Sequence, residues 1–261
     1  MRATKGFAWF LGAIALLGVA CSSKPDPAEV HRDAANEALN AGDWARAAQE
    51  FDASLKINPA QAKVWERKAY AHMKAGEIDP CEAALLKQAE LVSEPSKKAA
   101  VYRNIAGVRM GAGQSAKAEP WFAKAVELDP NDDQSLQWLG EIYSLRGGAR
   151  DMNATPVPDT LEKAVAYYDR LIKVKPDSSV AYLNKRIALN RIRDFEKQQQ
   201  QAAEQLLAVA TRARVKDSDK IAAAQADVDK HKARVDELGK QFDELSKKLV
   251  DLAKTSPPPP S

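Results

Sequence analysis

The side chains best suited to acid–base, nucleophilic or metal chemistry are widely scattered along this chain of 261 residues. None of the three histidines has a neighbouring Cys, His, Asp or Glu set at metal-ligand spacing; they are His31, His72 and His231. Adjacent carboxylates such as Asp132 and Asp133 fall where turns or solvated helix faces are predicted. The sequence also lacks a glycine-rich phosphate loop, a nucleophile elbow and a catalytic Cys/His signature. We therefore predict a protein that is not an enzyme and has no metal, cofactor or small-molecule substrate.

The composition favours stacked amphipathic helices over a single globular core. Hydrophobic residues make up 45% of the chain, charged residues 29% and aromatic residues only 7%. The 39 basic and 36 acidic residues nearly cancel to a net charge of +3. No nucleic-acid partner is expected from so balanced a charge.

Cys21 is the one candidate for covalent chemistry. Arg2 and Lys5 precede an apolar run from Phe7 to Ala20 that is too short for a membrane-spanning helix and is typical of a secretion signal. The end of that run, Leu17-Gly18-Val19-Ala20-Cys21, resembles the lipobox of bacterial lipoproteins, although a large apolar residue is commoner at the position of Gly18. The resemblance implies that residues 1–20 are a signal peptide and that the Cys21 sulfur carries diacylglycerol, with acyl groups such as palmitate anchoring the chain. Each buried acyl methylene contributes ~0.8 kcal/mol to the anchoring.

The residue after the lipidated cysteine predicts the membrane in which the protein is anchored. In lipoproteins an aspartate there favours retention in the inner membrane, so Ser22 points to the outer membrane, with the protein facing the periplasm. Residues 21–27 are then a lipidated tether. With Cys21 lipidated, Cys81 has no thiol partner within the chain and is interpreted as a small buried hydrophobic residue.

The element that organises the chain runs from Ala99 to Pro130 and resembles one tetratricopeptide repeat (TPR). The family's aromatic, small, turn and terminal proline positions are occupied by Tyr102, Ala106, Gly113, Ala118, Phe122, Ala125 and Pro130. Two antiparallel helices cross closely only where side chains are small, while bulky residues fill the space between neighbouring pairs. A single pair cannot bury its apolar face, so a stack of such pairs is expected.

Further units follow the same pattern. One runs from Ala28 to Pro59, and a second begins at Ala62, with Cys81 at a usual alanine position. A fourth begins at Asp133 and resumes at Leu161 after a long loop, for which we expect a partner contact. A fifth begins near Ser179 but lacks a closing proline. The predicted fold is all-α: a TPR solenoid of four to five helical hairpins over residues 28–193, followed by a long C-terminal coiled-coil helix.

Residues 194–254 are predicted to form this C-terminal helical segment, and residues 255–261 a proline-rich tail. The coiled-coil seam comprises Ile221, Val228, Val235, Leu238, Phe242, Leu245, Leu249 and Leu252, with His231 as its weak point. The seam can bind a second copy, bind a partner helix, or fold back on the helix over 195–214, with a bend at 215–219. The sequence does not choose among these three.

A concave groove is the predicted interaction site, because open solenoids present such a surface to partners. In TPR proteins the first helix of each pair lines it. The exposed first-helix positions carried onto this chain are Arg32, Asn36, Asn40, Lys63, Glu66, Tyr70, Met73, Lys74, Arg103, Met110, Gln137, Glu141 and Ser144. Their mixture of polar and amphipathic groups suits an extended peptide or a helix.

Over residues 21–202 the chain resembles outer-membrane TPR lipoproteins of bacterial envelope machinery, which are non-catalytic. The resemblance implies a scaffold that binds other envelope proteins of a multi-protein complex. We favour a gliding-motility complex, because the C-terminal seam suits an adaptor with two surfaces. The alternatives are a pilotin-like factor for type IV pilus secretins, a subunit of the outer-membrane protein assembly machine, and a cell-wall-associated lipoprotein.

Overall fold

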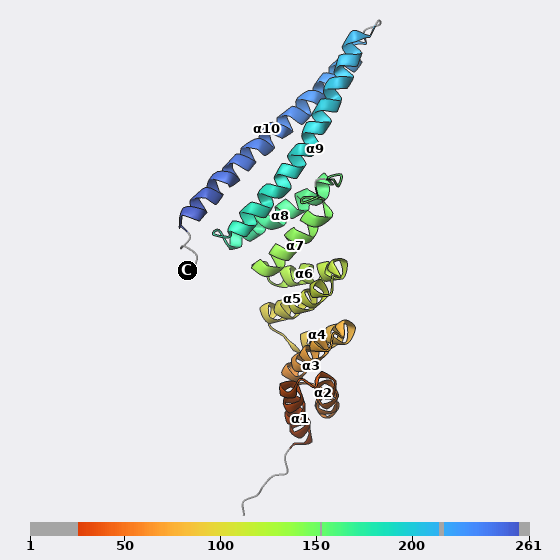
Figure 1. Ribbon diagram of the computed structural model, residues 1–261, viewed down its shortest axis with the longest axis vertical. Coiled ribbons are helices and arrows are strands. Elements are labelled where there is room, and N and C mark those ends of the chain that lie inside the picture. The colour runs from red at the N-terminus through yellow and green to blue at the C-terminus, as the bar shows by residue number, and fades with distance from the viewer. Residues whose placement is uncertain (1–25, 152, 214–216, 256–261) are drawn as a thin grey trace, which may run out of the picture.

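A computed structural model of the protein describes residues 26–151, 153–213 and 217–255, which form ten α-helices (Figure 1). In chain order they are α1 (Pro27–Ala41), α2 (Trp44–Ile57), α3 (Ala62–Lys74), α4 (Ile78–Leu91), α5 (Pro95–Gly111), α6 (Ser115–Leu128), α7 (Asp133–Arg146), α8 (Pro158–Val174), α9 (Ser179–Arg212) and α10 (Ser218–Thr255). Helices α1 to α8 stack as four antiparallel pairs along the long axis of the molecule (Figure 1). The predicted all-α solenoid of helical hairpins is confirmed.

The first three pairs turn between their helices at a glycine in the left-handed conformation. The φ angles of Gly42, Gly76 and Gly113 are 76°, 78° and 72°. Only glycine adopts this conformation without a steric penalty, which explains the spacing of glycines in the repeat pattern. After the first of these turns, the carboxylate of Asp43 accepts a hydrogen bond from the backbone N–H of Arg46 (3.1 Å) and caps α2.

Small side chains lie where the paired helices cross, and aromatic side chains fill the spaces between pairs. The buried small residues are Ala35, Ala69, Ala106 and Gly140 on the first helices and Ala47, Cys81, Ala118 and Ala164 on the second. Phe51, Phe122 and Tyr168 are fully buried fillers. The closest crossing is at Gly140, where an added Cβ would lie 2.6 Å from the ring of Tyr168. The pattern read from the sequence therefore corresponds to actual contacts.

The long connection between α7 and α8 is folded against the chain's own α9. A backbone hydrogen bond from Val157 N to Gly147 O (3.1 Å) closes its mouth. The buried guanidinium of Arg191 donates to the carbonyl oxygens of Gly148 (3.1 Å), Asp151 (3.0 Å) and Ala154. Three backbone oxygens of the loop are thus bound by α9. The partner contact expected from the sequence for this loop stays a prediction.

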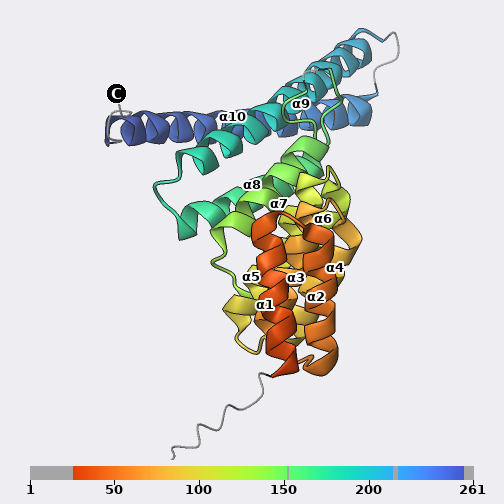
Figure 2. The same ribbon diagram turned by 60° about the horizontal axis from the view of Figure 1, so that its bottom comes forward.

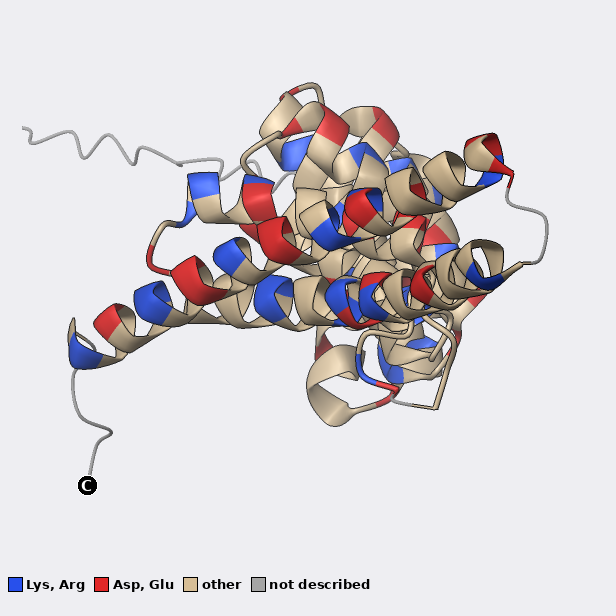
Figure 3. Ribbon diagram, turned by 90° about the horizontal axis from the view of Figure 1, so that it is seen from above, with Lys and Arg blue, Asp and Glu red and all other residues tan. Residues whose placement is uncertain are grey.

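The C-terminal region is a helical hairpin and not a single free helix. Helix α9 is 34 residues long and runs without interruption through the predicted boundary at residue 193, because no proline or glycine stops it there. Helix α10, 38 residues long, folds back antiparallel along α9 (Figure 2). Basic and acidic residues are interspersed along α10 (Figure 3).

The predicted coiled-coil seam packs inside this hairpin. Val228, Leu238 and Leu245 are buried, and Ile221, Val235, Phe242, Leu249 and Leu252 are half-buried. Leu238 and Leu245 belong to a core cluster with Tyr182 and Leu189 of α9 and Leu161 of α8. Of the three arrangements left open by the sequence, α10 adopts the fold-back, and the idea of self-association through a free seam is corrected accordingly. Helix α10 thereby covers the end of the solenoid.

Cys21, the leader before it, and the tail after Thr255 lie outside the described residues. Within the ranges that the structure describes, no helix has the length and apolar character needed to cross a membrane.

Candidate partner-binding groove

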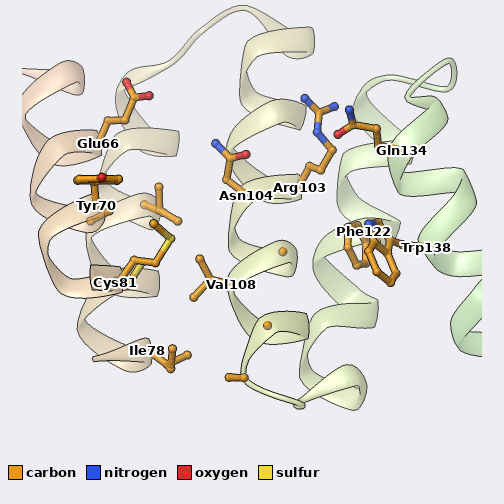
Figure 4. A pocket seen from close by; sticks show the side chains of 16 residues that line it. Glu66, Tyr70, Ile78, Cys81, Arg103, Asn104, Val108, Phe122, Gln134 and Trp138 are labelled. Atoms are coloured by element: carbon orange, nitrogen blue, oxygen red, sulfur yellow. The ribbon is translucent and has the colours of Figure 1, made fainter. Parts of the chain in front are cut away.

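A groove with a volume of about 620 Å³ opens between the second, third and fourth helix pairs (Figure 4). Its lining residues come from α3, α4, α5, α6 and α7: Glu66, Ala69, Tyr70, Met73, Ile78, Cys81, Leu85, Arg103, Asn104, Gly107, Val108, Gly111, Phe122, Gln134 and Trp138, with Ala112 just after α5. No single repeat forms it, so the stacking of the pairs creates the site.

One edge of the groove is polar. Glu66, Asn104, Arg103 and Gln134 project toward this edge in Figure 4. Arg103 is fixed in place because its Nη1 lies 2.8 Å from Oδ2 of Asp132, a buried carboxylate. Asp132 in turn caps α7 by accepting a hydrogen bond from the backbone N–H of Ser135 (3.2 Å).

The remainder of the groove is apolar and is bounded by two partly exposed aromatic side chains. Tyr70 is 43% exposed and Trp138 is 40% exposed. The ring of Trp138 stacks on Phe122 with centroids 6.1 Å apart, and Tyr70 meets Trp44 edge-on at 6.3 Å. Both rings are therefore held in place before any partner arrives, which lowers the entropy cost of binding.

Four of the predicted groove residues line this cavity: Glu66, Tyr70, Met73 and Arg103. Others lie outside it on exposed or half-exposed first-helix positions: Arg32, Asn36, Asn40, Lys63, Lys74 and Gln137. Two of these bind neighbouring side chains, since Asn36 Oδ1 accepts a hydrogen bond from Arg67 (2.7 Å) and Arg32 pairs with Glu29 (2.5 Å).

Three predicted groove residues serve the interior instead. Ser144 is buried, and Met110 is half-buried against the core cluster around Phe122. Glu141 is occupied by an ion pair with Arg150 of the α7–α8 loop (2.8 Å). Ser144 and Met110 pack into the interior and Glu141 is held by Arg150, so none of the three lines the groove.

The sequence reading missed several lining residues, of which Asn104, Gln134 and Trp138 are the most prominent. A signal for two of them was present, because Tyr70, Asn104 and Trp138 recur every 34 residues. Carrying the position of Tyr70 forward by one and by two TPR lengths would have identified Asn104 and Trp138.

The groove contains no evident chemistry. Burial, followed by the charge of Glu82, raises the pKa of the Cys81 thiol to about 11, so this side chain is a poor nucleophile at neutral pH. Across the described ranges there is no group of three His, Cys, Asp or Glu residues that could hold a metal ion. The arrangement is suited to binding.

The comparisons with known proteins agree with this fold. A family model described as "Tetratricopeptide repeat" matches residues 99–132. The Photosystem I assembly protein Ycf3 of Cyanophora paradoxa is 26% identical over 142 residues, which cover 51% of this chain and 81% of that protein. Superkiller complex protein 3 of Mus musculus is 23% identical over 143 residues, 54% of this chain but only 9% of that protein.

Solved TPR structures match most of the chain. A MamA structure aligns with a TM-score of 0.53 and 16% identity over 90% of this chain and 98% of that one. A TPR repeats protein from Bacteroides fragilis aligns with a TM-score of 0.55 and 13% identity over 89% of this chain and all of its own. At these identities the likeness concerns the fold alone. The protein is an α-helical repeat solenoid with the fold of these solved structures, and its residues 99–132 match the tetratricopeptide repeat itself. Repeats of this type generally serve as non-catalytic scaffolds for protein–protein interaction.

Proposed function

We propose that this protein is a lipid-anchored scaffold that binds another envelope protein in the groove between Tyr70 and Trp138. The observation that carries the proposal is the groove itself: a 620 Å³ apolar cavity with immobilised aromatic walls and one polar edge, formed by three helix pairs. An exposed apolar surface of this kind marks a binding site for a partner.

A second exposed surface supports an adaptor with two binding sites. On the distal part of α9, away from the core cluster that joins α8, α9 and α10, Leu206 is 65% exposed and Val209 is 70% exposed. They lie one turn apart on the same side of the helix. Because the coiled-coil seam is occupied within the hairpin, this pair replaces the seam as the second surface in the adaptor hypothesis.

The proposed location of the protein in the outer membrane rests on the sequence alone. Lipidation at Cys21 and the Ser22 that follows support an outer-membrane anchor, and the envelope-spanning machinery of gliding motility remains the favoured process. The address has its own test: Cys21→Ser should abolish incorporation of labelled palmitate and release the protein from membranes. Ser22→Asp should move it to the inner-membrane fraction of a density gradient.

The function is tested by crosslinking in cells that produce tagged protein, followed by identification of the co-purified proteins. Removing α10 is unsuitable, because Leu238 and Leu245 pack in the core of the hairpin. We would instead compare Trp138→Ala, which opens one wall of the groove, with Leu206→Lys/Val209→Lys on α9. Exposed Lys173→Ala on α8 is the matched control.

If the protein is an adaptor, we expect one set of motility components to be missing from the crosslinked proteins of the Trp138 variant and another set from those of the α9 variant. Recovery of a secretin that depends on Trp138 and is indifferent to the α9 variant would identify a pilotin-like factor. Cell-wall association that survives both variants would reject the scaffold in favour of a cell-wall-associated lipoprotein.

A further inference from the structure

The floor of the groove is unusually low, because the exposed face of α5 carries glycine at two positions one turn apart. An ideal Cβ added to Gly107 or to Gly111 would meet nothing within 4 Å, so no close contact among the described residues explains either glycine. Gly107 lies in the interior of α5, where glycine is about 1 kcal/mol less favourable than alanine. The helix therefore gives up stability at Gly107, where the open space above the floor leaves room for bulky side chains of a partner.

The polar groups of the groove are confined to one edge, and this decides between an extended and a helical occupant. An extended segment exposes backbone N–H and C=O groups along both of its sides and needs partners for them. On the side away from Glu66, Asn104 and Gln134, Figure 4 shows the aliphatic side chains of Ile78 and Val108, which offer neither donors nor acceptors. The lining also includes Gly107 and Gly111, which have no side chains. A helix satisfies its own backbone and presents an apolar stripe with a polar flank, which matches both edges.

The distribution of charge along the groove determines the orientation in which such a helix binds. Arg103 is neutralised by Asp132, whereas Glu66 makes no ion pair with any of the described residues. Glu66 is therefore available to pair with a cation of the partner, whereas the ring of Tyr70, one turn further along α3, already has the ammonium of Lys74 5.5 Å from its centroid. At the other end, the stacked side chains of Trp138 and Phe122 carry no charge.

From these three observations we propose that the occupant of the groove is an amphipathic α-helix of the partner. Its bulky apolar residues lie over Gly107 and Gly111, and a Lys or Arg near one end faces Glu66. The inference rests on the proposed function, because it specifies the partner of the same groove.

The test uses two displayed peptide libraries and the purified full chain carrying Cys21→Ser. In the first library a 16-residue helical scaffold of Ala, Gln, Glu and Lys carries randomised apolar residues at i, i+4, i+7 and i+11. The second has the same residues with two interior prolines, which prevent the helix. Selected peptides are then measured against the parent, Gly107→Leu and Glu66→Lys. Gly107→Leu adds a bulky side chain to the floor at a position where an added Cβ meets nothing within 4 Å, and Lys173→Ala on α8 is the control.

We expect binders from the helical library only, with binding about tenfold or more weaker to Gly107→Leu and unchanged with the control, a loss of at least about 1.4 kcal/mol. Peptides with a basic residue at one end should lose affinity for Glu66→Lys, and their acidic counterparts should gain it. Binders from the proline library alone would overturn the helical occupant and leave the peptide-binding groove intact. Binders from neither library would overturn the groove function as well, and binders insensitive to Gly107→Leu would place the helix elsewhere.

Discussion

Tyr143 of α7 donates a hydrogen bond from its hydroxyl to Oε1 of Glu119 on α6 over 2.5 Å, and this contact joins the third helix pair to the fourth. Arg146, one turn further along α7, binds the second oxygen of the same carboxylate at 2.5 Å. The hydrogen bond with Glu119, followed by burial, raises the pKa of Tyr143 to about 12. Burial alone would raise the pKa of Glu119, but the hydrogen bonds from Arg146 and Tyr143 outweigh it and lower the pKa below 4.5.

Glu119→Gln should therefore destabilise the solenoid in a pH-dependent way. A carboxyl group whose pKa is lowered in the folded state contributes stability above its unfolded pKa and loses it as the pH falls through the folded value. We expect the variant to be about 1 kcal/mol less stable than the parent at pH 7, with the difference fading below pH 4.5. Urea unfolding at both pH values measures this, with exposed Glu127→Gln on the same helix as control. Equal losses in the two variants would contradict the assignment.

The same glycine-to-alanine change should have opposite effects at two first-helix positions. In Gly140→Ala the new methyl group would lie 2.6 Å from the fully buried ring of Tyr168, which cannot move aside. We expect a loss of about 1–3 kcal/mol, the usual cost of overpacking a core. In Gly107→Ala nothing lies within 4 Å, and the gain in helix propensity should stabilise the chain by about 1 kcal/mol.

Thermal unfolding of Gly140→Ala, Gly107→Ala and the parent measures both changes in stability. A gain from both substitutions would mean that α7 and α8 do not approach as closely as Gly140 and Tyr168 indicate. A loss from Gly107→Ala would show that this glycine has a structural purpose within the chain, and would weaken the argument that a partner requires it.

The sequence predicted the solenoid because the repeat pattern records contacts between neighbours. Gly140 is glycine because Tyr168 lies against it, and both residues occupy consensus positions. The lining of the groove was predicted only in part, because the direction in which a first-helix side chain points depends on how each helix is rotated about its axis. Ser144 and Tyr70 both lie on first helices, yet only Tyr70 lines the cavity. The sequence could not predict that α10 folds back on α9 either, because an apolar seam packs equally well against any helix with a matching seam.

Arg191→Ala should release the α7–α8 loop. The buried guanidinium binds three backbone carbonyl groups of the loop, and its removal would leave buried oxygens without a donor. We expect a loss of about 3 kcal/mol and rapid proteolytic cleavage between Ala149 and Val157. Arg191→Lys should restore only part of the stability, because an ammonium group cannot reproduce the planar fork of the guanidinium. Exposed Arg212→Ala on the same helix is the control, and a parent-like cleavage pattern in Arg191→Ala would contradict this role.

Cys81 should resist alkylation while the chain is folded. Burial and the nearby Glu82 raise the pKa of its thiol from 9.0 to about 11, so very little thiolate exists at pH 8 and the sulfur is inaccessible. In a Cys21→Ser background, iodoacetamide labelling should be slow in buffer and fast in urea. Because the folded pKa is the higher one, this group's contribution to stability is complete below pH 9.0 and declines as the pH rises toward 11. Rapid labelling in buffer would show that the groove opens to the depth of Cys81.

His231 and Glu196 provide the last prediction, because they are the polar break in an otherwise apolar seam. Nδ1 of His231 lies 2.6 Å from Oε2 of Glu196, and the two side chains are only 15% and 17% exposed. In His231→Leu the carboxylate of Glu196 would keep its burial and lose its partner, so the single change should destabilise the hairpin by about 1–2 kcal/mol. In His231→Leu/Glu196→Leu both polar groups are gone and an apolar pair continues the seam, so we expect a double variant at least as stable as the parent. Thermal unfolding gives the net effect, and hydrogen exchange of the amides over 221–231 locates it. If His231→Leu alone already protects those amides, the contact between His231 and Glu196 contributes nothing to holding α10 against α9, and the apolar seam is sufficient.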